Sequence, residues 1–262
     1  MSDYRILFLD IDGTILRRND TIEDSTKEAI AQVREQEVEV VLATGRPLHE
    51  IGEIAEELKI DSFIGYNGAY AIYKGKNIFD EPMDASTVSD YLQIADEHHH
   101  EIILYTSTKN TFTTLDTQQM KTFIKTFHLR QNELFTTEDI DKVLGMTIIN
   151  MKEDDHLLYN KEGIHLAQVN VEGIGLCYDV IRDTVNKGVA VKVMLEHFNI
   201  PKEKAIAFGD GLNDKEMLSL VGEGFAMGNA HPDLFQYAKN KTTDVDTSGV
   251  YNGLKSLGLV ND

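Results

Sequence analysis

Short apolar runs that end in polar, glycine-containing turns recur along this chain, and they constrain its fold more than any other feature. Residues 6–9 form the first such run, and similar runs follow at 38–43, 63–66 and 205–208. Runs this short and this apolar indicate strands that are buried on both faces of a sheet. Helical patterns separate the runs. The alternation predicts an α/β fold with a doubly wound parallel sheet.

Two helices are predicted between the early strands. Ser25-Thr26-Lys27-Glu28 has the form of a capping box ahead of apolar residues at helical spacing, which predicts a helix start there. Pro47 suits the first turn of a second helix, because the apolar residues between Leu48 and Leu58 also repeat at helical spacing. The expected order is strand, helix, strand, helix and a third strand.

The pattern changes after the third strand. Residues 69–79 indicate an antiparallel hairpin, and from about Pro82 to Arg182 helical and strand patterns follow in a looser order. The earlier pattern resumes at Asn186-Lys187-Gly188, so a second domain is inserted into the first. We predict a catalytic core made of residues 1–81 and 183–262, and an inserted α+β domain at residues 82–182.

Composition excludes several classes of partner. Forty-four acidic and 25 basic residues give a net charge of −19, which repels nucleic acid and anionic lipid surfaces. No apolar stretch approaches the roughly 20 residues of a transmembrane helix, and no signal peptide is recognisable, so we expect a cytoplasmic protein. We also expect it to be a monomer or a weak homo-oligomer. Cys177 is the single cysteine, which excludes an intrachain disulfide, and its neighbours indicate a buried strand position.

Polar side chains gather where the predicted strands end. Because the carboxyl ends of parallel strands meet at one edge of a sheet, we expect one shared site made by Asp10, Asp12, Thr44, Arg46, Asn67, Lys187, Asp210, Asn213 and Asp214. Taken alone, a turn such as Asp10-Ile11-Asp12-Gly13 is structural or solvated more often than it is catalytic. Four carboxylates in one crevice require positive charge, however, and oxygen ligands without cysteine or histidine favour Mg²⁺. Since Mg²⁺ combines few carboxylates with phosphate oxygens, the expected substrate is a phosphate ester.

The spacing of the first two aspartates suggests their division of labour. A carboxylate beside Mg²⁺ stays ionised and can attack phosphorus, while a carboxyl two residues away can protonate the leaving oxygen and later activate water. Asp10 is the candidate nucleophile and Asp12 the candidate acid and base.

Five motifs in order resemble those of the haloacid dehalogenase (HAD) superfamily, and in particular its Cof-type phosphatases with a type IIB cap. They are Asp10-x-Asp12-Gly-Thr, Ala43–Pro47, Tyr66–Ala69, Asn186–Gly188 and Gly209–Asp214. The resemblance implies a Rossmann-like core with an inserted cap that closes over the site. It also implies Mg²⁺-dependent hydrolysis of a small phosphate ester, such as a sugar phosphate, through an aspartyl-phosphate.

The resemblance further implies roles for the matching residues. Asp10 is the nucleophile, and Asp12 is the acid and base and also a metal ligand through its backbone carbonyl. Thr44 and Lys187 act on the transferring phosphoryl group. The implied substrate-binding residues are Thr44, Gly45, Arg46, Asn67, Gly68, Lys187 and Asn213, and the implied metal-site residues are Asp10, Asp12, Asp210 and Asp214.

Two other functions fit parts of the pattern. A phosphomutase would return the phosphoryl group to a sugar, and the sequence does not separate it from a hydrolase. A phospho-accepting regulatory module would use an aspartate at a strand end, but it needs neither Asp12 nor an insertion of about a hundred residues.

Overall fold

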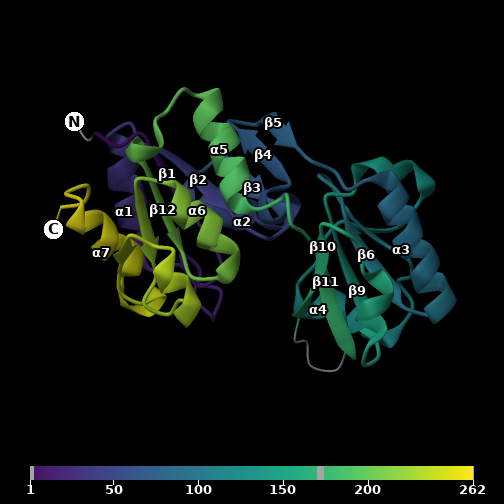
Figure 1. The fold of residues 1–262 in the computed structure, drawn as a ribbon. Coiled ribbons are helices and arrows are strands. Elements are labelled where there is room, and N and C mark those ends of the chain that lie inside the picture. The colour runs from purple at the N-terminus through teal and green to yellow at the C-terminus, as the bar shows by residue number, and fades with distance from the viewer. Residues whose placement is uncertain (1–2, 170–173, 262) are drawn as a thin grey trace. The chain divides into compact units, whose positions relative to one another are not determined.

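The computed structural model describes residues 3–169 and 174–261, which form two compact units (Figure 1). Unit 1 comprises Met1–Arg46, Gly52–Phe79 and Asn186–Asp262, and unit 2 comprises Pro47–Ile51 and Asp80–Val185. Within the described ranges, no helix combines the length and the apolar character that a membrane span requires.

Unit 1 is built on an eight-stranded sheet with the order β14-β13-β12-β1-β2-β3-β4-β5. The strands are β1 (Ile6–Leu9), β2 (Glu39–Ala43), β3 (Phe63–Gly65), β4 (Tyr70–Tyr73), β5 (Lys76–Asp80), β12 (Ala205–Gly209), β13 (Glu223–Ala226) and β14 (Asn240–Lys241). The pairs from β14 to β3 are parallel, and β4 runs antiparallel to β3. The predicted α/β fold with a parallel sheet is confirmed.

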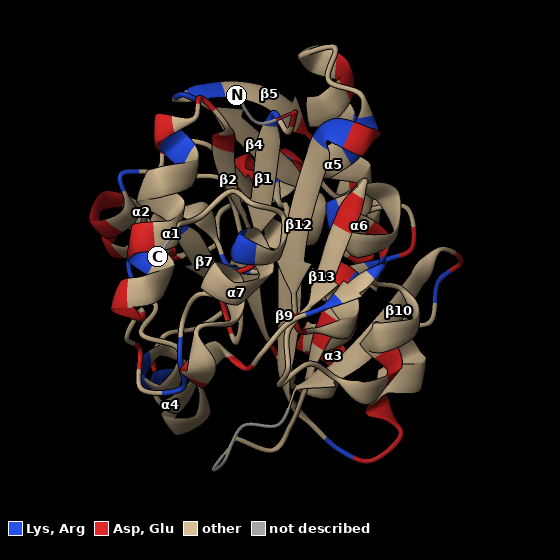
Figure 2. Cartoon of the chain, turned by 90° about the vertical axis from the view of Figure 1, so that its left-hand side faces the viewer, with Lys and Arg blue, Asp and Glu red and all other residues tan. Residues whose placement is uncertain are grey.

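Helices cover both faces of this sheet. They are α1 (Asp24–Glu35), α2 (Gly52–Leu58), α5 (Lys187–His197), α6 (Lys215–Leu220) and α7 (Gly249–Ser256). Apolar residues of α5 and α6 pack with Ile6 and Phe8 in one core cluster. On the other face α7 approaches β12 so closely that a Cβ on Gly253 would lie 2.4 Å from the Phe208 ring. Strands β1 and β12 carry no charged residue along their length (Figure 2), as strands covered on both faces require.

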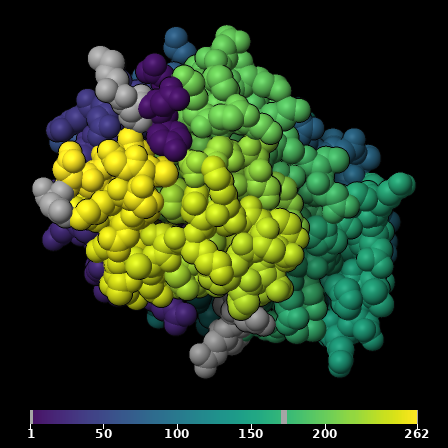
Figure 3. Space-filling view, turned by 60° about the vertical axis from the view of Figure 1, so that its left-hand side comes forward, coloured from purple at the N-terminus to yellow at the C-terminus, as the bar shows by residue number. Residues whose placement is uncertain are grey.

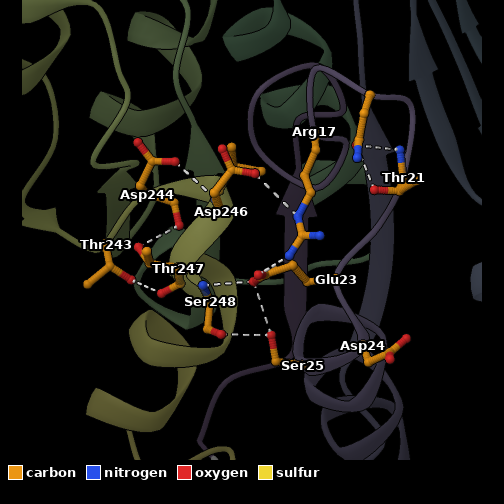
Figure 4. A network of polar contacts seen from close by, with 12 residues as sticks. Arg17, Thr21, Glu23, Asp24, Ser25, Thr243, Asp244, Asp246, Thr247 and Ser248 are labelled. Carbon is orange, nitrogen blue, oxygen red and sulfur yellow. Dashed lines mark hydrogen bonds and ion pairs between the residues drawn. The ribbon is translucent and has the colours of Figure 1, made fainter.

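The start of α1 differs from the prediction. The helix begins at Asp24, its N-cap is Glu23, and no side chain caps it. The Ser25 hydroxyl oxygen lies 3.3 Å from a carboxylate oxygen of Glu23 and 2.9 Å from the Ser248 hydroxyl oxygen (Figure 4). The predicted capping box at Ser25 is therefore wrong, because these residues bind a segment distant in the sequence instead of the helix terminus.

The C-terminal segment of unit 1 lies against its N-terminal part. Figure 3 shows the yellow C-terminal residues beside the purple N-terminal ones. The Glu23 carboxylate accepts hydrogen bonds from Arg17 and from the Ser248 backbone N–H, the latter at 2.8 Å (Figure 4). Gln36, just after α1, donates to the Leu259 carbonyl at 2.7 Å. These contacts hold α7 beside α1.

Unit 2 is a six-stranded sheet with the order β10-β11-β9-β6-β7-β8. Its strands are β6 (Glu101–Tyr105), β7 (Asn110–Phe112), β8 (Asn132–Leu134), β9 (Gly145–Met151), β10 (Ile164–Val169) and β11 (Leu176–Arg182), and its helices are α3 (Ala85–His98) and α4 (Gln118–Thr126). All pairs are antiparallel except β7 with β8. Helix α3 packs on one face and α4 on the other. Cys177 is buried in β11, as expected.

The segment Pro47–Ile51 belongs to unit 2 although it follows Arg46 of unit 1 directly. It contains a 3-10 turn, Leu48–Glu50, and α2 begins only at Gly52, so the helix predicted from Pro47 is interrupted. The Glu50 carboxylate accepts hydrogen bonds from the Asn110 side chain at 2.7 Å and from the Arg130 backbone N–H at 2.8 Å. These tertiary contacts override the local helical spacing.

Candidate active site

The polar residues predicted from the strand ends lie where the strands of unit 1 end. Asp10 follows β1, Thr44 follows β2 and Asp210 follows β12. Lys187 is the first residue of α5, and Asp214 ends the short 3-10 turn Leu212–Asp214. The parallel register of β2, β1 and β12 places the first three turns at the same edge of the sheet.

Lys187 is the centre of the site. Its side chain is fully buried, and its ammonium contacts Asp10 Oδ1 at 2.5 Å and Asp214 Oδ1 at 2.6 Å. Burial alone would lower the pKa of Lys187, but the charges of Asp10 and Asp214 raise it above its usual value. A lysine at the N-terminus of a helix is opposed by the helix dipole, so these carboxylates account for its position.

Three carboxylates surround this single lysine. One oxygen from each of Asp10, Asp210 and Asp214 can be chosen so that all lie within 4.8 Å of one another. Burial, followed by the charge of Asp214, raises the pKa of Asp10 well above its usual value and that of Asp210 to about 6. One ammonium does not balance three carboxylates. A hard divalent cation with oxygen ligands fits the donor set, since it would supply the missing charge.

Backbone and side-chain donors fix the two aspartates beyond β12. Asp214 Oδ2 accepts hydrogen bonds from the backbone N–H groups of Asp210 and Gly211, both at 3.0 Å. Asp210 accepts from Thr14 Oγ1 at 3.3 Å and from Asn229 Nδ2 at 3.4 Å. The sequence analysis did not assign Thr14 and Asn229 to the site, although Thr14 belongs to the first motif and Asn229 also follows a strand.

Gly13 allows Asp210 to come close. Its φ is +82°, and a Cβ at this position would lie 2.2 Å from Asp210 Oδ2. Any residue with a Cβ at this position would therefore be strained and would displace the Asp210 carboxylate.

Asp12 does not join the carboxylate cluster through its side chain. Its carboxylate is about half exposed and forms a two-pronged ion pair with Arg46, in which Arg46 Nε lies 2.8 Å from Oδ2. Thr44 is fully buried, and its hydroxyl accepts a hydrogen bond from the Arg46 backbone N–H at 3.0 Å. The Thr44 hydroxyl hydrogen therefore remains available for an oxygen of a ligand.

Asn67 connects the remaining predicted residues. Its Oδ1 accepts a hydrogen bond from Asn213 Nδ2 at 2.9 Å and would lie 2.9 Å from a Cβ on Gly45. Gly68, with a φ of +104°, lies so close to the N-cap of α5 that a Cβ at this position would be 2.2 Å from the Asn186 carbonyl oxygen. All the residues in the two predicted sets therefore lie in unit 1, at or near this edge of the sheet.

The fold and this arrangement of aspartates define a class of protein. A family model of haloacid dehalogenase-like hydrolases matches residues 7–254, so the chain belongs to that family and the predicted hydrolase class is confirmed. The chain is 30% identical over 98% of its length, and over 99% of the relative, to the Bacillus subtilis (strain 168) protein named "Putative phosphatase YkrA". It is 25% identical to 5-amino-6-(5-phospho-D-ribitylamino)uracil phosphatase YitU of the same organism, covering 95% of this chain and 96% of the relative.

A solved structure agrees with this assignment. A protein from Geobacillus kaustophilus HTA426 matches 98% of this chain and 100% of its own, with a TM-score of 0.90 and 28% identity. The likeness thus extends over both units.

Proposed function

We propose that the protein is a phosphatase that hydrolyses a small phosphate ester through an aspartyl-phosphate on Asp10. The observation that carries the proposal is the buried group of Asp10, Asp214 and Lys187, in which Lys187 contacts Oδ1 of each carboxylate. Names of relatives that include the word phosphatase support the same reaction class. The electrophile in this reaction is the phosphorus atom of the substrate, so the protein has to supply only the nucleophile.

In the first step Asp10 attacks phosphorus. Lys187 holds Oδ1, which leaves Oδ2 to form the new bond. The ester P–O bond breaks, and Asp12 donates a proton to the departing oxygen, so that an alcohol leaves. In the second step Asp12 removes a proton from water, the water oxygen bonds to phosphorus, and the Asp10–phosphorus bond breaks to release inorganic phosphate.

The other residues position the phosphoryl group. Thr44 offers its hydroxyl hydrogen and Lys187 its positive charge to the phosphoryl oxygens. Mg²⁺ would be held by Asp10, Asp210 and the Asp12 carbonyl, and Asp214, whose two oxygens already bind Lys187 and backbone N–H groups, would support its waters. The ion would neutralise charge on the phosphoryl oxygens and keep the neighbouring carboxylates ionised. Arg46 orients Asp12 through their ion pair, so that the acid and base stays near the leaving oxygen.

Release of inorganic phosphate from a panel of phosphate esters tests this function. We expect turnover with Mg²⁺ and its loss when EDTA removes the ion. Asp10→Asn should abolish turnover while the melting curve stays that of a folded protein. An active Asp10→Asn variant would refute the covalent mechanism. Formation of an isomeric sugar phosphate in place of inorganic phosphate would indicate a mutase and contradict the proposal.

A further inference from the structure

Asn229 joins three segments of unit 1 through its side-chain amide. It lies in the turn that follows β13. Its Oδ1 accepts a hydrogen bond from the Val245 backbone N–H at 2.9 Å, and its Nδ2 donates to the Gly13 carbonyl oxygen at 2.8 Å. The same Nδ2 lies 3.4 Å from Asp210 Oδ2. One side chain thus connects the turn after β1, the turn after β12 and the 3-10 turn Val245–Thr247, which we call the C-terminal turn.

The orientation of this amide follows from the chemistry of its partners. A backbone N–H can only donate, so the atom of Asn229 that faces Val245 must be the carbonyl oxygen Oδ1. The Nδ2 group therefore faces Gly13 and Asp210, and its two hydrogens match these two acceptors. Because both hydrogens are used inside the protein, Asn229 is suited to positioning the site and not to binding a substrate.

The Asp210 carboxylate has a hydrogen-bond donor at each oxygen. Thr14 Oγ1 donates to Oδ1 at 3.3 Å, and Asn229 Nδ2 approaches Oδ2. The turn that contains Asn229 also holds the backbone of Asp210, because the His231 N–H donates to the Asp210 carbonyl oxygen at 2.9 Å. Outer hydrogen bonds of this kind orient a carboxylate that binds a metal, and removing one typically lowers metal affinity by about 10- to 100-fold.

The C-terminal turn is itself anchored on the N-terminal part of unit 1. The carboxylate of Asp246, within the turn, lies 3.4 Å from Arg17 Nε. The backbone N–H of Ser248, directly after the turn, donates to the Glu23 carboxylate at 2.8 Å (Figure 4). Contacts within the protein therefore fix the turn that orients Asn229.

We propose that Asn229 is a positioning residue that sets the divalent-cation affinity of the candidate active site. It holds Asp210 and, through Gly13, the turn that follows β1, so that the cation finds its oxygen ligands already oriented. The inference rests on the proposed phosphatase function and adds a residue that lies outside the five sequence motifs. Asn229 acts through Asp210 and Gly13, and it contacts neither the phosphoryl group nor the leaving group.

Two measurements on Asn229→Ala test the inference, and both start from protein that EDTA and dialysis have freed of metal. The first is the Mg²⁺ concentration that gives half-maximal hydrolysis of 4-nitrophenyl phosphate. The second, which needs no turnover, is the Mg²⁺ concentration that raises the melting temperature by a fixed amount. We expect both concentrations to rise about 10- to 100-fold. At saturating Mg²⁺, kcat and the KM for this substrate should stay within about threefold of the wild-type values.

Two further variants isolate the effect. Asn252→Ala is the matched control, because Asn252 is an exposed asparagine of α7 that supports the same C-terminal turn. It donates to Thr243 Oγ1 at 2.8 Å and to the Thr247 carbonyl oxygen at 3.0 Å. Both Mg²⁺ concentrations of Asn252→Ala should match the wild type within about twofold. Asn229→Leu keeps the size of the side chain but can neither donate nor accept, so it should behave as Asn229→Ala does. Since Asn229 is exposed, both of its variants should stay folded in EDTA.

The outcomes separate this inference from the proposed function. If the wild type is a Mg²⁺-dependent phosphatase and Asn229→Ala keeps both Mg²⁺ concentrations within about twofold, the inference is overturned while the phosphatase function stands. An equal rise in Asn252→Ala also overturns it, since the effect would then belong to the C-terminal turn as a whole. A loss of kcat at saturating Mg²⁺ without a change in either concentration contradicts it too, because Asn229 would then act on the reaction and not on the cation. A wild type with neither phosphatase activity nor a Mg²⁺-dependent melting temperature overturns both proposals.

Discussion

Replacing Lys187 by methionine removes the single ammonium from a buried group of carboxylates and keeps most of the aliphatic side chain. Lys187 and Asp214 are fully buried, and Asp10 is 5% exposed. Removing one partner of a buried ion pair costs about 3–5 kcal/mol, because the remaining charges have no water to solvate them. For a domain of about 150–250 residues that loss lowers the melting temperature by roughly 6–20 °C.

The loss should depend on pH. Because Asp10 already has a raised pKa, acid neutralises part of the uncompensated charge in Lys187→Met, so the difference from the wild type should be larger at pH 8 than at pH 5. Far-UV circular dichroism is the suitable probe, since the chain contains no tryptophan. The buffer should contain EDTA, which keeps divalent cations from replacing the lost charge.

Two companion variants control this experiment. Lys192→Met alters an exposed lysine of the same helix, with 65% of its side chain accessible, and should shift stability by less than about 0.5 kcal/mol. Asp10→Asn in the Lys187→Met background removes one of the unpaired charges and should restore part of the stability. The electrostatic account of this site is wrong if the free energy of unfolding of Lys187→Met at pH 8 lies within about 1 kcal/mol of the wild-type value. It is also wrong if the added Asp10→Asn restores no stability.

Three other substitutions have distinct expected results. Asp12→Asn should slow hydrolysis of alkyl phosphates far more than of aryl phosphates, whose leaving groups need less protonation; equal losses in kcat would remove Asp12 as the acid. Gly68→Ala should lower stability by about 1–3 kcal/mol, and by more than Gly75→Ala in thermal melts, because both glycines have positive φ but only Gly68 faces the Asn186 carbonyl oxygen. Burial raises the pKa of Asp179 in the folded state. The stability that the protonated side chain contributes is therefore present below the unfolded pKa of about 3.9 and is lost as the pH rises. In denaturant titrations, Asp179→Asn should be more stable than the wild type at pH 7 and equal to it near pH 4.

The sequence predicted the parts of the molecule that depend on the order of its elements. Asp10, Thr44 and Asp210 could be placed together because each ends a parallel strand, and that rule needs no knowledge of side-chain contacts. Lys187 could be added because a lysine at a helix start is unfavourable to the helix dipole, which indicates that another role accounts for its position. These inferences use the chain direction alone.

The features that the sequence did not predict depend on partners distant in the chain. Ser25 has the local pattern of a capping residue, yet it bonds Ser248, more than two hundred residues later. The segment around Glu50 has helical spacing, yet hydrogen bonds from Asn110 and Arg130 hold it in unit 2. Asn229 reaches Asp210 from another strand end without a recognisable motif. Tertiary contacts decide such positions, and a single sequence contains no local signal for them.

The position of β1 has a consequence for the synthesis of the chain. This strand pairs with β2 on one side and with β12 on the other, where Ile6 lies opposite Ala205. At about 5–20 residues per second a ribosome needs roughly 10–40 s to make the intervening chain. During that time one edge of an entirely apolar strand has no native partner, while the residues of unit 2 emerge in nearly continuous order and can fold. A nascent chain that stops before β12 therefore exposes an edge that invites aggregation, and it lacks Lys187, Asp210 and Asp214 if it stops before α5.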